Sequence, residues 1–228
     1  MTLLHVTRLS ARGADRVAAD IQTLVIAGWT GRDEAAVRHH IEELQAIGVP
    51  PPSSVPVFYR VAAANLTQAA RVEMLGPHGS GEAEPVVVSL ADGLWLGLGS
   101  DHTDRVAEAQ GIALSKQLCA KPVAATLWRL EEVEAHWDAL ELTATITEGG
   151  AEVVYQRGTL AAMRHPRDLL ARRPGGPDLP PGTAMFCGTL GAIGGIRPAA
   201  RFAMRLHDPV LGRTIEHAYE VVELPVVA

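Results

Sequence analysis

The chain has 228 residues, of which 47% are hydrophobic and 20% are charged, a balance that is typical of globular proteins and excludes a disordered chain. With 20 basic and 26 acidic residues, the formal net charge is −6 at pH 7, which argues against nucleic acid as the main partner. No apolar run reaches the roughly 18–20 residues of a membrane span, and residues 1–12 lack the apolar segment of a signal peptide. The two cysteines make no disulfide framework, so we expect a cytoplasmic protein without a membrane partner.

The predicted elements begin with a strand over residues 24–28, an apolar run that follows small residues from Val17 onward and leads into a loop. Apolar residues at positions 37, 41, 44 and 47 then recur at helical spacing, and this helix must end before the prolines at 50–52. From residue 57 onward the pattern favours strands and turns. Buried strands are predicted over 85–90 and 94–98, a short helix over 130–139, and a hairpin over 140–155 around Gly149-Gly150. After a surface loop over 172–182, a second hairpin is predicted over 202–224. The fold class is therefore α+β and mostly β, an irregular β-roll with few helices.

Three acidic residues are candidates for metal binding. Glu82 and Glu84 stand at i and i+2 at the mouth of a strand, so their carboxylates project from one face and repel unless a cation lies between them. Taken alone, a solvated hairpin edge is the commoner explanation for such a pair. Asp101 follows the apolar run 94–99 and could add a third oxygen ligand, although a capped turn with an Asp–Arg pair explains it equally well. Three carboxylates without thiolates or paired imidazoles suit Mg²⁺, Mn²⁺ or Ca²⁺ better than Zn²⁺.

A histidine and a glutamate on the predicted helix are candidates for water activation. His40 lies in the apolar stripe of that helix, and Glu43 stands three residues further on, within reach of it. A carboxylate that orients an imidazole raises its basicity, although a histidine on such a face is more often a core residue. His39 and Glu42 have the same spacing on a more polar face.

Two lysines and a glycine-rich loop complete the candidates. Lys116 and Lys121 bracket Cys119, and a lysine beside a metal site could stabilise developing negative charge, whereas a solvated surface amine is the usual alternative. Nothing in the sequence supports Cys119 as a nucleophile. Gly188 and Thr189 open a loop over 188–195 whose backbone N–H groups could approach a small carboxylate, or which could be a plain turn. The loop matches neither a Walker motif nor a dinucleotide fingerprint.

In their order along the chain, these motifs resemble the fumarylacetoacetate hydrolase superfamily, and in particular a bacterial branch of it catalogued as a domain of unknown function. The matching segments span about residues 25–222 and are His40-Ile41-Glu42-Glu43, Glu82-Ala83-Glu84, residues 101–105, Ser115-Lys116, residues 156–159 and residues 179–189. The resemblance implies one catalytic domain over 1–228, with an N-terminal strand and lid-helix segment over 1–56 and a mixed β-roll core over 57–228. It also implies a homodimer. The segment after Lys116, residues 117–122, departs from the family pattern.

The resemblance also implies roles for the candidate residues. Glu82, Glu84 and Asp101 would hold Mg²⁺ or Mn²⁺, and Arg105 and Lys116 would bind the substrate's oxyanions. His40 with Glu43 would activate water on a mobile lid. Gly188 and Thr189 would hold a carboxylate of the substrate.

The implied function is hydrolytic cleavage of a C–C bond in a small oxo acid or 1,3-dicarbonyl compound such as an acylpyruvate. A decarboxylase, isomerase or hydratase on the same metal platform is the first alternative. A non-catalytic protein that binds a dicarboxylate is the second.

Overall fold

The computed structural model describes residues 1–46 and 51–227, except for the side chains of His40, Glu43 and Leu44. The fold is α+β and mostly β, as predicted, and is built on one eight-stranded and one five-stranded sheet. The larger sheet has the order β2-β1-β12-β9-β8-β15-β3-β4, and the smaller one has the order β14-β13-β16-β17-β6.

The strands of the larger sheet are β1 (Thr2–Ser10), β2 (Gly13–Ile21), β3 (Thr23–Gly28), β4 (Val57–Val61), β8 (Ala83–Leu90), β9 (Gly93–Ser100), β12 (Thr126–Arg129) and β15 (Thr183–Phe186). Those of the smaller sheet are β6 (Arg71–Leu75), β13 (Glu141–Glu148), β14 (Ala151–Thr159), β16 (Arg201–Asp208) and β17 (Arg213–Leu224). Two short ribbons pair β7 (Gly79–Ser80) with β10 (Thr103–Asp104) and β5 (Leu66–Thr67) with β11 (Lys121–Pro122). The α-helices are α1 (Glu34–Ala46), α2 (Arg105–Glu108), α3 (Ile112–Leu118) and α4 (Pro166–Arg172). The 3₁₀ helices are η1 (Ala63–Asn65), η2 (Leu130–Glu132), η3 (Glu134–Ala139) and η4 (Leu160–Ala162).

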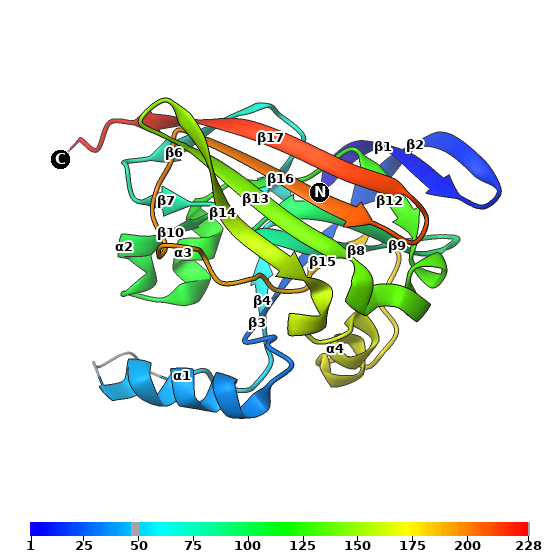
Figure 1. Ribbon diagram of the computed structural model, residues 1–228, viewed down its shortest axis with the longest axis horizontal. Coiled ribbons are helices and arrows are strands. Elements are labelled where there is room, and N and C mark those ends of the chain that lie inside the picture. The colour runs from blue at the N-terminus through cyan, green and yellow to red at the C-terminus, as the bar shows by residue number, and fades with distance from the viewer. Residues whose placement is uncertain (47–50, 228) are drawn as a thin grey trace.

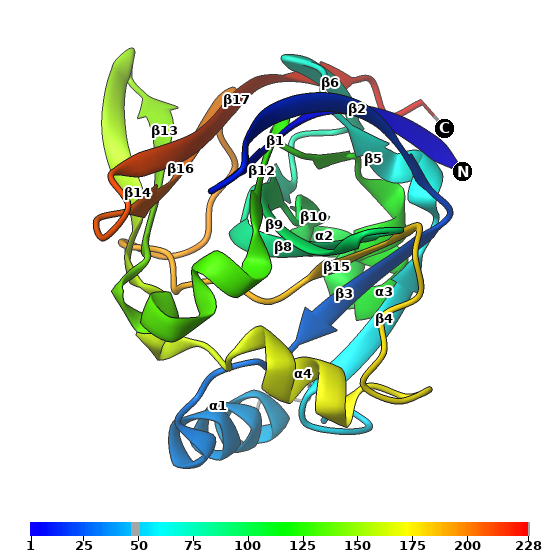
Figure 2. The same cartoon turned by 90° about the vertical axis from the view of Figure 1, so that its right-hand side faces the viewer.

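The larger sheet buries both of its faces, which explains the nearly continuous apolar sequence of β8. Because successive side chains of a strand point to opposite faces, Val87 packs into the core between the two sheets, whereas Val86 and Val88 pack into a second core. Figure 2 shows β1 and β2 curving over this second core, so that the larger sheet forms a partly closed roll.

The helices gather away from the five-stranded sheet. In both views α1 lies on the opposite side of the molecule from β17 and beyond the edge formed by β3 and β4 (Figures 1 and 2). Asp33 caps α1, because its carboxylate accepts hydrogen bonds from the backbone N–H groups of Ala35 and Ala36 at 2.9 and 3.0 Å.

Both predicted hairpins are confirmed, as β13–β14 and β16–β17. The strand predicted over 24–28 is confirmed as β3, whereas β1 and β2 ahead of it were not predicted. The helix predicted over 130–139 is instead two 3₁₀ helices, with a non-helical backbone at His136. The predicted helix over 37–47 corresponds to α1, and its last residue lies outside the described part of the chain.

Candidate metal and substrate site

The structure brings three acidic side chains together at one end of the β8–β9 hairpin. Glu82, Glu84 and Asp101 each place one carboxylate oxygen within 4.8 Å of those of the other two. Asp101 is fully buried and Glu84 is 3% exposed, while the side chain of Glu82 keeps 17% of its exposure. The solvated hairpin edge is therefore not what the chain forms here.

The register of the hairpin creates this cluster. Leu90 pairs with Gly93 across a two-residue turn, so Ala83 pairs with Ser100 and the next residues, Glu82 and Asp101, face each other beyond the strand ends. The backbone N–H of Asp101 donates a 2.9 Å hydrogen bond to the carbonyl of Glu82, which holds the two in place.

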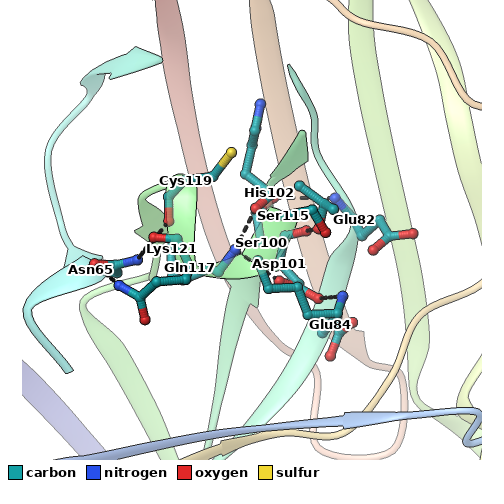
Figure 3. A network of polar contacts seen from close by, with 12 residues as sticks. Asn65, Glu82, Glu84, Ser100, Asp101, His102, Ser115, Gln117, Cys119 and Lys121 are labelled. Atoms are coloured by element: carbon teal, nitrogen blue, oxygen red, sulfur yellow. Dashed lines mark hydrogen bonds and ion pairs between the residues drawn. The ribbon is translucent and has the colours of Figure 1, made fainter. Parts of the chain in front are cut away.

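Two buried ammonium groups bind Asp101 from different elements. Lys116 of α3 forms an ion pair with its Oδ2, and Lys121 of β11 lies 3.0 Å from its Oδ1. Lys121 also donates to the backbone carbonyl of His102, and Figure 3 shows its side chain reaching toward both Asp101 and His102. Asp101 thus pairs with two lysines rather than with Arg105.

Arg105 is instead committed to Glu82. Its guanidinium lies 3.0 Å from Glu82 Oε1 and also contacts Glu108 Oε2 at 3.1 Å and Ser80 Oγ at 2.7 Å. In this arrangement the arginine orients a carboxylate of the cluster. Contact of Arg105 with a substrate stays a prediction.

Glu84 differs from the other two carboxylates, because it forms no ion pair with any described residue. Its Oε2 accepts a 2.7 Å hydrogen bond from the backbone N–H of Gly188, in the glycine-rich loop. Gly188 has φ +100°, and a Cβ there would lie 1.7 Å from Thr30 Oγ1, so only glycine fits. Thr189 donates through its hydroxyl to the carbonyl of Ala83 at 2.8 Å.

The electrostatics of the cluster follow from these contacts. Burial, then the charges of Asp101 and Glu82, raise the pKa of Glu84 well above its ordinary value. Burial alone would raise the pKa of Asp101, but Lys121 and Lys116 hold it below its ordinary value.

The two lysines shift in opposite directions. Burial opposes the charge of Lys116, yet Asp101 and Glu82 raise its pKa above the ordinary value. Burial lowers the pKa of Lys121. The charge of Asp101 raises it, but the repelling charge of Lys116 adds to the effect of burial, so the pKa lies below its ordinary value.

The cluster fits a hard divalent cation. Glu82 and Asp101 form ion pairs and Glu84 forms none with a described residue, so its raised pKa favours the protonated form unless a further cation is bound. A divalent ion among the three oxygens would be that cation, and a set made only of carboxylates is what Mg²⁺ or Mn²⁺ prefers over Zn²⁺.

The cluster opens into a cavity of about 480 Å³, a size typical of small-molecule sites. Its inner end carries the three carboxylates, Lys116, Gly188 and Thr189. Its other walls come from the β3–α1 loop, from α1 through Ala36 and Val37, and from Tyr59 of β4.

The remaining sequence candidates are placed as follows. Lys116 is 7% exposed and so is not a solvated amine. Cys119 is buried, and burial raises the pKa of its thiol, which argues against a nucleophile. The side chains of His40 and Glu43 lie outside the described residues, so their roles stay predictions.

Several site residues were missed from the sequence: Lys121 as a second partner of Asp101, Glu108 as a partner of Arg105, and Trp29 and Tyr59 as cavity walls. For Lys121 a signal was present, since it lies in the segment that departs from the family pattern. The aromatic residues gave no comparable signal, because β4 and the β3–α1 loop meet the cluster only through the sheet order.

The model of a family described as "Protein of unknown function (DUF2848)" matches residues 27–219. The chain belongs to this family. No curated protein matches it.

Solved structures share the fold at low identity. A crystal structure of Cg1458 with inhibitor is 15% identical, has a TM-score of 0.64, and aligns over 93% of this chain and 81% of its own. A structure of 2-keto-3-deoxy-D-arabinonate dehydratase complexed with magnesium and 2,5-dioxopentanoate is 14% identical, with a TM-score of 0.62, over 96% and 79% of the two chains. A hexagonal crystal form of 2-keto-3-deoxyarabinonate dehydratase is 15% identical and has a TM-score of 0.63. It aligns over 94% of this chain and 78% of its own. At these identities the likeness establishes the fold.

Among helices of the described residues, none has both the length and the apolar character needed to cross a bilayer.

Proposed function

We propose that this protein is a divalent-metal-dependent hydrolase that cleaves a C–C bond in a small oxo acid or acylpyruvate-like compound. The observation that carries the proposal is the buried cluster of Glu82, Glu84 and Asp101 with Lys116 at the closed end of a substrate-sized cavity. The fold is shared with dehydratases of oxo acids, one of which was solved with magnesium and a dioxo acid, and this supports the same substrate class.

Glu82, Glu84 and Asp101 would hold Mg²⁺ or Mn²⁺, with Ca²⁺ as a further candidate. The bound ion would act as a Lewis acid toward adjacent carboxylate and keto oxygens of a 2-oxo acid. Arg105 keeps Glu82 oriented, and Lys121 keeps Asp101 ionised and in place.

The residues of the chain then act on the substrate. Lys116 holds a positive charge at the cluster, where it can stabilise the enolate oxygen that develops as the C–C bond breaks. Gly188 and Thr189 are proposed to bind a substrate carboxylate. A base on α1, either His40 with Glu43 or His39 with Glu42, would take a proton from the water that attacks the remote carbonyl.

Dehydration is the second candidate reaction. It needs the same enolate stabilisation but removes water from the substrate, and the fold likeness to dehydratases of 2-oxo acids favours it. A decarboxylase, isomerase or hydratase on the same platform, or a silent dicarboxylate-binding protein, would keep the cluster as well. We also propose that the chain acts as one catalytic domain over 1–228, in a cytoplasmic homodimer.

A screen of acylpyruvates and 2-keto-3-deoxy sugar acids tests the proposal. Turnover is followed by ultraviolet absorbance with Mg²⁺, with Mn²⁺ and with EDTA. Metal-dependent cleavage that puts ¹⁸O from solvent water into the released acid supports hydrolysis. Metal-dependent loss of water without ¹⁸O uptake would move the assignment to a dehydratase, and binding without turnover would leave a binding protein.

A further inference from the structure

The outer half of the cavity has a composition that says more about the substrate than the acidic cluster does. Apart from Thr30, Asp33 and Glu108, the side chains that line it are apolar or aromatic, and they include Trp29, Ala36, Val37, Tyr59, Ile112 and Ala162. These residues belong to the β3–α1 loop, α1, β4, α3 and η4, which lie far apart in the sequence and meet only in the folded chain.

The wall is close to the metal cluster. Lys116 Nζ, which pairs with Asp101, lies 5.9 Å from the centroid of the Tyr59 ring. Trp29 lines the same cavity as Tyr59. A 2-oxo acid whose head group sits at the cluster would therefore place its next carbon atoms against these two rings.

Trp29 holds its place at a conformational cost. Its φ of +58° lies in the left-handed region, which bulky residues rarely adopt. Residues held in this region cluster at ligand-binding sites, where the surrounding structure enforces them. Here the strained residue is part of the aromatic wall.

The charged residues that line the cavity also favour an uncharged substrate tail. Among the described lining residues, five are acidic and Lys116 is the one cation. Two of the acids, Asp33 and Glu108, lie outside the metal cluster. Two further cations adjoin the cluster and both are already paired, Arg105 with Glu82 and Glu108, and Lys121 with Asp101. A second carboxylate on the substrate would therefore find acidic and apolar neighbours and no free cation among these residues.

From this combination we infer that the substrate is a monocarboxylic 2-oxo acid with an uncharged, apolar or aromatic tail, and that Trp29 and Tyr59 select the tail. The inference rests on the proposed function. It excludes the dicarboxylates that the sequence alone left open as ligands.

Binding of matched acids to the Mn²⁺-loaded full-length protein tests the inference, by isothermal titration calorimetry. Oxalate probes the head-group site alone. The compounds 2-oxopentanoate and 2-oxoglutarate have the same number of carbon atoms and differ in a terminal methyl group or carboxylate, and 2-oxo-4-phenylbutanoate adds an aromatic ring. We expect 2-oxopentanoate to bind at least tenfold more tightly than 2-oxoglutarate, and the phenyl compound to bind more tightly still.

Two variants sharpen the test. Tyr59→Ala is expected to weaken binding of the phenyl compound at least tenfold. Ile112→Lys, which adds a cation to the wall, is expected to strengthen 2-oxoglutarate binding at least fivefold, a gain that misfolding could not produce. Leu114→Ala, at a 46% exposed position of the same helix outside the cavity, is the matched control and should change neither affinity.

The outcomes separate the two proposals. If oxalate binds only with metal, but 2-oxoglutarate binds as tightly as 2-oxopentanoate, the inference about the tail is overturned and the metal-dependent function stands. If oxalate shows no metal-dependent binding, the proposed function fails and the inference falls with it.

Discussion

Replacing Glu84 by glutamine should stabilise the metal-free protein and abolish its response to metal. The carboxylate is buried and forms no ion pair with a described residue, and one of its oxygens lies within 4.8 Å of an oxygen of Glu82 and of Asp101. Two unit charges at that distance repel by roughly 3.5 kcal/mol at an effective dielectric constant of about 20. The attraction of Lys116 offsets about one of the two repulsions. The neutral amide of glutamine accepts a weaker hydrogen bond from the Gly188 N–H than the carboxylate does, which costs about 1 kcal/mol. The net gain is about 2 kcal/mol, or a rise in Tm of about 4–8 °C for a domain of this size.

Thermal unfolding with EDTA and with Mn²⁺ measures both effects. The Tm of wild type should rise when Mn²⁺ is added. The Tm of Glu84→Gln should be higher than that of wild type in EDTA and should rise little with Mn²⁺. Glu152→Gln, at an exposed position on β14, is the control and should behave like wild type. A Glu84→Gln protein that melts lower than wild type in EDTA, or that responds to Mn²⁺ as wild type does, would refute the reasoning.

Three further predictions follow from the same contacts. The raised pKa of Glu84 means that the folded metal-free protein retains a proton that the unfolded chain releases, so the contribution of Glu84 to stability should fall as pH rises above about 4.5. Guanidinium unfolding of wild type and Glu84→Gln from pH 4.5 to 8 checks this, because the other titrating groups are common to both proteins, and a stability difference that does not change with pH would contradict it. Lys121→Met should destabilise the protein by about 2–4 kcal/mol in urea unfolding, since it removes one partner of a buried ion pair while leaving Lys116 on Asp101; a loss below 1 kcal/mol would show that Lys121 contributes little. Gly188→Ala would place a Cβ 1.7 Å from a side-chain oxygen at φ +100°, so its Tm should fall by at least about 4 °C, and an unchanged Tm would argue against this backbone geometry.

The acidic cluster could largely be predicted from the sequence because it depends on local geometry. Spacing of i and i+2 puts Glu82 and Glu84 on one face, and a tight turn between two apolar strands places Asp101 opposite Glu82. The fold class followed from the same alternation of apolar and polar residues, which gave both hairpins.

The rest of the site depends on long-range contacts that leave no periodic signal. Tyr59 reaches the cavity because β4 pairs with β3 at the edge of the sheet, and β3 pairs in parallel with β15, more than 150 positions later in the chain. Lys121 is buried because β11 pairs with β5, although lysine is ordinarily an exposed residue. The strands β1 and β2 were missed for a similar reason, since their place in the sheet depends on the long-range pairing of β1 with β12.

The central claim is that three carboxylates hold one divalent cation. The most direct measurement is anomalous diffraction from crystals of the protein soaked in Mn²⁺. The account predicts one strong peak per chain among the carboxylate oxygens of Glu82, Glu84 and Asp101, and its loss in Glu84→Gln crystals. A Mn²⁺-saturated crystal with no peak there would contradict it.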